Sequence, residues 1–328
     1  MGDALLVAVA TGVLSCSATR ALIPVLRRRN ILDCPNDRSS HTVPIPRGGG
    51  AAAIGSVLLV WLLLAGQGLV AGDVIAISVG AGLLAIVCWV DDLRGLSPVL
   101  RLAAQAAAVA IGLSVLPQPQ DLPHGWLWPP AQLAIVGLVW VWAVNLFNFM
   151  DGIDGIAGTE AASIGAGLLV FATFGAGADP VLALLCAALL GGSIGFLVWN
   201  WSPARIFLGD VGSAPLGYLL GFLLLGLAAR GFWKIALILP LYFLADATIT
   251  LGRRLLRGER VWQAHREHFY QLAVRRGLSH AAVVKRIIAA DVVLIGCGWA
   301  AENGWGAISL IVAAVTVATL LLALVRGR

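Results

Sequence analysis

Long apolar runs recur along the whole chain and constrain its fold more than any other feature. Each run has about 20 residues, and a helix of that length crosses a hydrocarbon core about 30 Å thick. Of the 328 residues, 59% are hydrophobic and only 12% are charged, with a mean hydropathy of +0.91. An average soluble domain has roughly 25% charged residues. The sequence therefore predicts an all-α, polytopic integral membrane protein and excludes a soluble globular one.

The apolar runs between polar segments predict about eleven transmembrane helices within a single transmembrane domain, residues 1–328. The expected spans are 4–26, 51–69, 74–90, 101–116, 131–147, 159–176, 181–199, 213–229, 232–251, 286–301 and 305–325. The longer polar segments, which we expect on one face of the membrane, are 27–50, 91–101, 148–158, 200–212 and 252–285.

Basic residues fall almost entirely on one side of the predicted membrane. The exceptions are Arg20, inside the first run, and Arg230 and Lys234, which share a loop on the other side. Because basic residues of short loops stay in the cytoplasm, we expect a bacterial inner-membrane protein with a periplasmic N-terminus and a cytoplasmic C-terminus. Its active-site cleft is then expected at the cytoplasmic face. The net charge of +5 follows from this topology, so nucleic acid is not an expected partner.

Aspartates gather at the predicted cytoplasmic face, at positions Asp91, Asp92, Asp151, Asp154 and Asp210. Since each would cost about 2.5 to 3.5 kcal/mol at the centre of a bilayer, we expect them to line one wet pocket. Converging carboxylates repel each other unless a cation lies among them. Oxygen ligands favour Mg²⁺ or Mn²⁺, and Mg²⁺ usually shares protein carboxylates with substrate phosphates. The pattern predicts such a metal and a phosphate substrate, although any single aspartate could instead cap a helix.

Two of the cytoplasmic segments add positive charge and glycine. Arg38 and Arg47 precede the glycine run 48–50, and backbone N–H groups near helix starts bind anions. The segment 252–285 is rich in arginine and contains the string His-Arg-Glu-His at 265–268. On a helix, the two histidines of this string would share a face and could donate together to an anionic group. Attraction of the arginines to anionic lipid is the alternative explanation.

These motifs, in this order, resemble those of the polyprenyl-phosphate N-acetylhexosamine-1-phosphate transferases of glycosyltransferase family 4. The resemblance runs from 38–50 through Asp91-Asp92, 145–158 and 207–213 to the histidine segment, and so covers essentially the whole chain. The family includes enzymes that initiate O-antigen synthesis and the phospho-MurNAc-pentapeptide translocase of peptidoglycan synthesis.

The resemblance implies a role for each residue that matches a family motif. Asp210 matches the principal Mg²⁺ ligand, and Asn148 an asparagine that helps to place the metal and the diphosphate. Asp91 and Asp92 match the aspartate pair near the attacking lipid phosphate. Arg101 falls where the family has a basic residue facing the diphosphate. The further basic candidates for substrate binding are Arg38, Arg47 and Arg266.

Other matches concern the nucleotide and the sugar. Asp151 and Asp154 occupy the family's Asp-Gly-x-Asp-Gly positions, with Asp154 expected near the uridine and Phe207 expected to stack on uracil. His265 and His268 resemble the histidines of a loop that closes over the sugar phosphate. The candidate catalytic residues are thus Asp91, Asp92, Asp151, Asp154, His265 and His268. Asp246, inside the ninth run, is expected to support the same pocket.

The histidine segment departs from the family pattern. The peptidoglycan translocase has three consecutive histidines there, whereas this chain has His-Arg-Glu-His followed by Phe269, Tyr270 and Gln271. The segment is closer to that of the O-antigen initiators. It leaves open whether the sugar is GlcNAc, GalNAc, FucNAc or QuiNAc.

The implied reaction is Mg²⁺-dependent transfer of N-acetylhexosamine 1-phosphate from a UDP-sugar to polyprenyl (undecaprenyl) phosphate, with release of UMP. Transfer of phospho-MurNAc-pentapeptide is the alternative within the family, and a homodimer is a further expectation. Outside the family, an intramembrane prenyltransferase and a secondary transporter are the alternatives. A transporter would show internal repeats and carboxylates near the midplane, whereas here the carboxylates lie at one interface.

Overall fold

The computed structural model describes residues 2–35, 43–117, 129–260 and 265–326, and it is almost entirely helical. The helices of these residues are α1 (Gly2–Arg28), α2 (Gly50–Gly66), α3 (Asp73–Arg94), α4 (Pro98–Leu113), α5 (Pro129–Met150), α6 (Ile156–Phe174), α7 (Pro180–Asn200), α8 (Asp210–Ala229), α9 (Trp233–Ile238), α10 (Leu241–Leu256), α11 (Phe269–Arg275), α12 (His280–Ala300), a π-helical turn η1 (Ala301–Trp305) and α13 (Gly306–Arg326). The strands are β1 (Leu32–Asp33) and β2 (Ile45–Pro46), which pair antiparallel.

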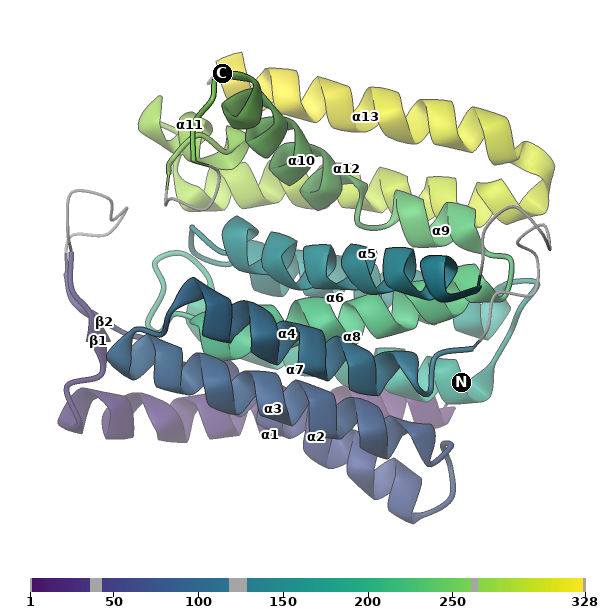
Figure 1. Ribbon diagram of the computed structural model, residues 1–328, viewed down its shortest axis with the longest axis horizontal. Coiled ribbons are helices and arrows are strands. Elements are labelled where there is room, and N and C mark those ends of the chain that lie inside the picture. Colours follow the sequence, from purple (N-terminus) through teal and green to yellow (C-terminus); the bar gives the residue numbers. More distant parts are fainter. Residues whose placement is uncertain (1, 36–42, 118–128, 261–264, 327–328) are drawn as a thin grey trace.

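The long helices lie side by side in one bundle with their axes roughly parallel (Figure 1). Within the described residues, seven helical segments are long and apolar enough to cross a membrane: α1, α3, α5, α6, α7, α8 and the segment 280–326, in which a kink at Asn303 and Gly304 separates α12 from α13. This confirms the predicted all-α, polytopic membrane fold. The two termini lie at opposite ends of the bundle, and β1, β2 and α11 lie at the end that carries the C-terminus (Figure 1). The assignment of that end to the cytoplasm stays a prediction.

The ninth expected span was wrong as a single helix. Residues 232–251 form two helices, α9 and α10, separated by Leu239 and Pro240. Proline has no backbone N–H and its ring clashes with the preceding turn, so a helix that reaches it kinks or breaks. The tenth span also begins earlier than expected, at His280 rather than at 286, because Ser279 caps the helix by accepting a hydrogen bond from the backbone of Ala282.

Glycines let α1 and α7 pack backbone against backbone. A Cβ atom added at Gly191 would lie 2.0 Å from the carbonyl oxygen of Ala8, and one added at Gly195 would lie 2.2 Å from that of Gly12. Helices in a membrane gain no hydrophobic driving force from association, so close van der Waals packing of small residues holds them together. This contact anchors the first helix to the centre of the bundle.

We expect Gly191→Ala to lower the stability of the protein, because the new methyl group must push the two backbones apart. Overpacking of this kind typically costs about 1–3 kcal/mol. Thermal unfolding in detergent measures it. Gly296→Ala is the matched control, since a Cβ at that position on α12 meets no atom within 4 Å. Equal melting temperatures for the two variants would contradict the packing described here.

Candidate active site

A backbone clip joins the segment after β2 to the loop before α8. The Phe207 amide donates to the Pro46 carbonyl at 2.8 Å, and the Gly49 amide donates to the Phe207 carbonyl at 2.8 Å. The glycine run explains this close approach, since a Cβ at Gly50 would lie 2.2 Å from the Cα of Gly212. Two segments more than 150 residues apart are therefore held together, and this places Arg47 beside the first turn of α8.

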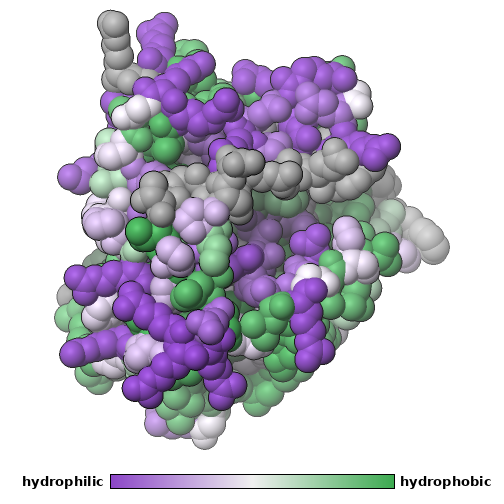
Figure 2. Space-filling view, turned by 90° about the vertical axis from the view of Figure 1, so that its left-hand side faces the viewer, coloured by the Kyte–Doolittle hydropathy of each residue, from purple (hydrophilic) through white to green (hydrophobic). Residues whose placement is uncertain are grey.

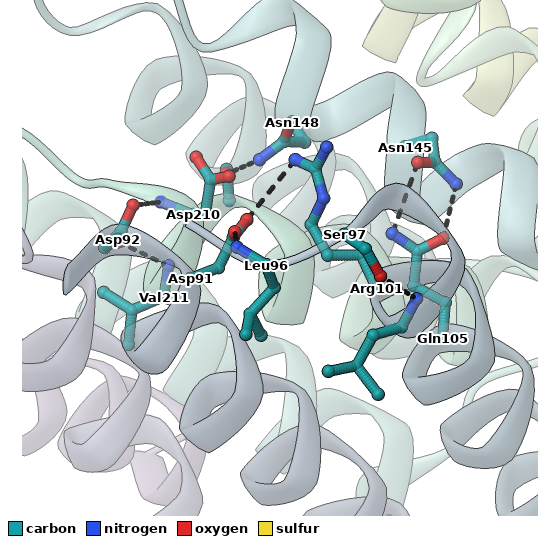
Figure 3. A network of polar contacts seen from close by, with 12 residues as sticks. Asp91, Asp92, Leu96, Ser97, Arg101, Gln105, Asn145, Asn148, Asp210 and Val211 are labelled. Carbon is teal, nitrogen blue, oxygen red and sulfur yellow. Dashed lines mark hydrogen bonds and ion pairs between the residues drawn. The ribbon is translucent and has the colours of Figure 1, made fainter. Parts of the chain in front are cut away.

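Arg47 bridges two of the predicted aspartates. Its Nη2 atom lies 2.6 Å from Oδ1 of Asp92 and 3.0 Å from Oδ1 of Asp210. The side chain of Asp92 is only 3% exposed and also accepts from the backbone amides of Asp210 and Val211, at 3.4 and 3.3 Å. The first amides of α8 and the guanidinium of Arg47 thus hold the Asp92 carboxyl group next to Asp210. Figure 3 shows the contacts of Asp92 with α8. Burial opposes the charge of Arg47, but the coulombic attraction of Asp92 and Asp210 more than compensates and raises the pKa of Arg47.

Asp91 faces a different neighbour from the adjacent Asp92. It accepts a 2.6 Å hydrogen bond from the backbone amide of Leu96, and its Oδ2 lies 3.3 Å from Nη1 of Arg101. Asp91 thus fixes the short turn between α3 and α4 while it orients Arg101 (Figure 3). Arg101 keeps 41% of its side chain exposed, so it remains accessible for an anionic ligand.

Asn148 and Asp151 complete this side of the site. At the end of α5, Nδ2 of Asn148 donates to Oγ of Ser213 on α8 at 3.0 Å. The Asp151 side chain is half-buried and forms no hydrogen bond or ion pair with the residues that the structure describes. Burial and the nearby charge of Asp210 raise the pKa of Asp151 to about 7. The structure therefore brings Asp92, Asp210 and Asn148 together, with a carboxyl group nearby that has no contacting cation.

The donor set fits a hard divalent cation that shares its ligands with a substrate. Asp210 and Asn148 provide carboxylate and amide oxygens, which suit Mg²⁺. No cluster of three or more His, Cys, Asp or Glu side chains in the described parts of the chain could hold a metal ion on its own. Mg²⁺ commonly keeps waters and substrate phosphates among its ligands, so a partial protein site is what such a metal requires.

Asp154 points to other partners. Its Oδ2 accepts from the backbone amide of Ala204 at 3.2 Å and lies 3.2 Å from Nδ1 of His280, at the start of α12. Burial alone would raise the pKa of Asp154, but the contacts with His280, Ala204 and Ser202 hold it below its usual value. Asp154 therefore ties its own loop to the loop before α8 and to α12.

The histidine segment is not helical, contrary to the geometry expected for a shared helix face. His268 is the residue before α11 and is 2% exposed, with Nδ1 3.0 Å from Oδ1 of Asp246. The two imidazoles nevertheless lie together, with ring centroids 4.9 Å apart. Burial and the neighbouring His268 and Arg254 lower the pKa of His265 to about 4, so it is neutral near pH 7. Arg266 is half-buried beside them, and Arg38 lies outside the described residues.

Asp246 is the anchor of this segment. Its carboxylate accepts from the backbone amides of Phe269 and Tyr270 at the start of α11, at 3.0 and 3.3 Å. The hydroxyl of Tyr270 donates in turn to the carbonyl of Phe149 at 3.1 Å, and a Cβ at Gly152 would lie 2.2 Å from that hydroxyl. These contacts dock α11 on the Asp-Gly-Ile-Asp-Gly loop, and a supporting role of Asp246 in the pocket stays a prediction. Hydrophilic residues surround a hollow at this end of the bundle (Figure 2).

Tyr270, His280 and Asn200 are residues that the sequence analysis missed. Asn200 accepts from the Gly155 amide at 3.0 Å and donates to the Ile206 carbonyl at 2.9 Å. Tyr270 follows the histidines directly, which was a usable signal. His280 stands alone in its segment, so only the fold reveals its contact with Asp154.

We expect Asp154→Asn to lower stability by about 1–3 kcal/mol at pH 7, where the wild-type carboxylate is ionised and hydrogen-bonded. Because its folded-state pKa is held below the usual value, this contribution is present above that value and disappears as the pH falls through the folded-state pKa. Unfolding measured from pH 7 to pH 3 should show the two proteins converging in acid. A difference that stays constant over this range would rule out the carboxylate as its source.

The chain is also similar in sequence to known proteins. The model of glycosyl transferase family 4 matches residues 74–228, which run from α3 to the end of α8. A phospho-N-acetylmuramoyl-pentapeptide-transferase of Synechococcus sp. (strain JA-3-3Ab) is 35% identical, with 85% of this chain and 86% of the relative covered. That of Synechococcus elongatus is 30% identical, covering 77% and 74%. A probable undecaprenyl-phosphate N-acetylglucosaminyl 1-phosphate transferase of Bacillus subtilis is 30% identical, covering 82% and 77%. The chain therefore belongs to glycosyl transferase family 4.

Proposed function

We propose that this protein transfers N-acetylhexosamine 1-phosphate from a UDP-sugar to polyprenyl phosphate, releasing UMP and forming a polyprenyl-diphosphate sugar. The observation that carries the proposal is the Arg47 bridge between Asp92 and Asp210, which gathers charged groups at one end of an apolar bundle. A cleft there can receive a nucleotide from water while the lipid tail stays in the bilayer. Membership of glycosyl transferase family 4 supports this assignment, as does the relative named a probable undecaprenyl-phosphate N-acetylglucosaminyl 1-phosphate transferase.

In this proposal, Asp210 and Asn148 hold Mg²⁺ together with the diphosphate of the donor. When bound, the metal would neutralise negative charge on the diphosphate and on the leaving UMP. Manganese has the same preference for oxygen ligands and could replace it. Arg101 is exposed enough to contact a phosphate, and Asp91 fixes its direction. Arg47 would bind phosphate from the other side of the cleft.

The remaining residues are proposed to bind the nucleotide and the sugar. Phe207 is half-buried beside the clip and would stack on uracil. His268 directs its Nδ1 toward Asp246, which leaves Nε2 as the nitrogen that can meet a ligand. His265, which is neutral near pH 7, would act as a hydrogen-bonding group rather than as a cation. Positive charge in this part of the site would then come from Arg266.

The chemistry needs positioning more than proton transfer. A phosphate monoester has a second pKa of about 6, so the lipid phosphate is largely ionised at neutral pH and can attack without a strong base. Its oxygen forms a bond to the β-phosphorus as the bond to UMP breaks. Asp92, already engaged by Arg47 and by the first amides of α8, would orient groups rather than accept a proton. One diphosphate linkage replaces another, so the reaction should be reversible.

Two donors remain candidates within the family. The His-Arg-Glu-His segment favours an N-acetylhexosamine donor and, with it, the initiation of a surface glycan such as O-antigen. Relatives that carry the name phospho-N-acetylmuramoyl-pentapeptide-transferase favour UDP-MurNAc-pentapeptide instead. The donor preference of the purified protein decides between them.

We expect Asp210→Asn to reduce UMP release at least about 100-fold, the loss typical of removing one preorganised electrostatic contact from an active site. The assay uses the detergent-purified protein with polyprenyl phosphate, Mg²⁺ and a panel of UDP-N-acetylhexosamines plus UDP-MurNAc-pentapeptide. Asp73→Asn is the matched control, because Asp73 is an exposed aspartate at the start of α3, at the opposite end of that helix from Asp92.

Three results would count against the proposal. UMP release that continued without polyprenyl phosphate would indicate hydrolysis rather than transfer. Equal activity of Asp210→Asn and the control would remove Asp210 from the reaction. Failure of added UMP to regenerate UDP-sugar from the lipid product would contradict the near-balanced chemistry.

A further inference from the structure

Two carboxyl groups lie in the interior of the bundle, apart from the site described above. Glu160 on α6 is 0% exposed and Asp291 on α12 is 2% exposed. All four of their carboxyl oxygens are buried and have no hydrogen-bond partner of normal geometry among the described residues. The two side chains are near enough to interact electrostatically. The mechanism proposed above uses neither of them.

Two ionised carboxylates cannot remain side by side in such an environment. An ionised side chain inside a membrane costs several kcal/mol unless it is paired, and two like charges at one place cannot both persist. Among the described residues, no arginine, lysine or histidine forms an ion pair with either group. At least one of the two groups must therefore be neutral, and a bound proton is the simplest way to neutralise it.

We propose that Glu160 and Asp291 bind one proton between them, as a carboxylic acid on one helix hydrogen-bonded to a carboxylate on the other. The shared proton would satisfy an oxygen on each side, and O–H···O⁻ bonds of this type are short and roughly twice as strong as neutral ones. This is a proton-binding site that joins α6 to α12.

The surroundings favour one remaining negative charge at this place. The backbone amide of Phe243, in the first turn of α10 after the break at Pro240, lies near Glu160. The hydroxyl of Ser163 lies near Asp291. The other titratable groups that face the pair come from α10, namely Tyr242 and, beyond it, Asp246. Each of these is neutral or negative, so none of them replaces the proton.

The location gives the pair a structural consequence for the active site. Helix α6 begins directly after Asp154, and α12 begins with His280, whose ring contacts Asp154. A proton that locks α6 to α12 therefore also sets the two helix starts that carry this contact. Loss of the proton would leave two repelling charges inside the interface and push the helices apart.

Infrared difference spectroscopy tests the proposal directly. Wild-type protein in lipid nanodiscs at pH 7.5 is compared with the double variant Glu160→Gln/Asp291→Asn, so that the absorption of all other carboxyl groups cancels in the difference spectrum. We expect the difference spectrum to show one protonated carboxyl and one carboxylate, in equal amounts. Two carboxylates, or two protonated groups, would overturn the shared proton.

A second measurement does not depend on the double variant. An unfolded chain releases the proton to water, so the unfolding constant of the wild type in mixed detergent should rise by up to about tenfold per pH unit above the usual range of carboxyl groups. Glu160→Gln should flatten this dependence, whereas Asp73→Asn should not. Replacing choline chloride with sodium chloride in the buffer should leave the free energy of unfolding unchanged. A sodium-dependent increase would show that a metal cation occupies the site and would overturn the proposal.

Discussion

Negative charge inside an apolar bundle must be offset by contact with a cation, a backbone amide or a proton, and the structure depends on how each carboxylate meets this requirement. Asp92 uses a guanidinium and the start of α8. Asp154 uses His280 and a loop amide. Asp246 uses the first amides of α11. In each case the partner comes from a distant part of the chain, so satisfying the charge also fixes the tertiary structure.

The same contacts explain why the site forms at one end of the bundle. The clip between the segment after β2 and Phe207 carries Arg47 to the first turn of α8. Tyr270 and Gly152 bring α11 down on the loop after α5. Both contacts combine buried apolar side chains with backbone hydrogen bonds, and both need glycines that allow close approach. A substitution at these glycines would separate the charged groups without altering any of them.

The sequence predicts the membrane fold well and the site only in part. Each apolar run contains many residues that carry the same signal, so the spans can be predicted with errors of a few residues at their ends. Pro240 should have divided the ninth span. The placement of aspartates on one face is also recoverable, because each follows an apolar run. The partner of each aspartate cannot be predicted in this way, since the direction of a side chain depends on packing. The sequence gives no sign that His280 contacts Asp154 or that Glu160 and Asp291 lie near enough to interact electrostatically.

The Asp91-Asp92 pair shows why adjacency in a motif is not equivalence of role. Successive residues of an α-helix point about 100° apart, because the helix has 3.6 residues per turn. The two aspartates at the end of α3 therefore point in different directions, and here one turns to Arg101 while the other turns to Arg47 and α8. Each aspartate then controls a different arginine. The two residues of the pair therefore fix the directions of two different cations, which a single carboxylate in this geometry would not do.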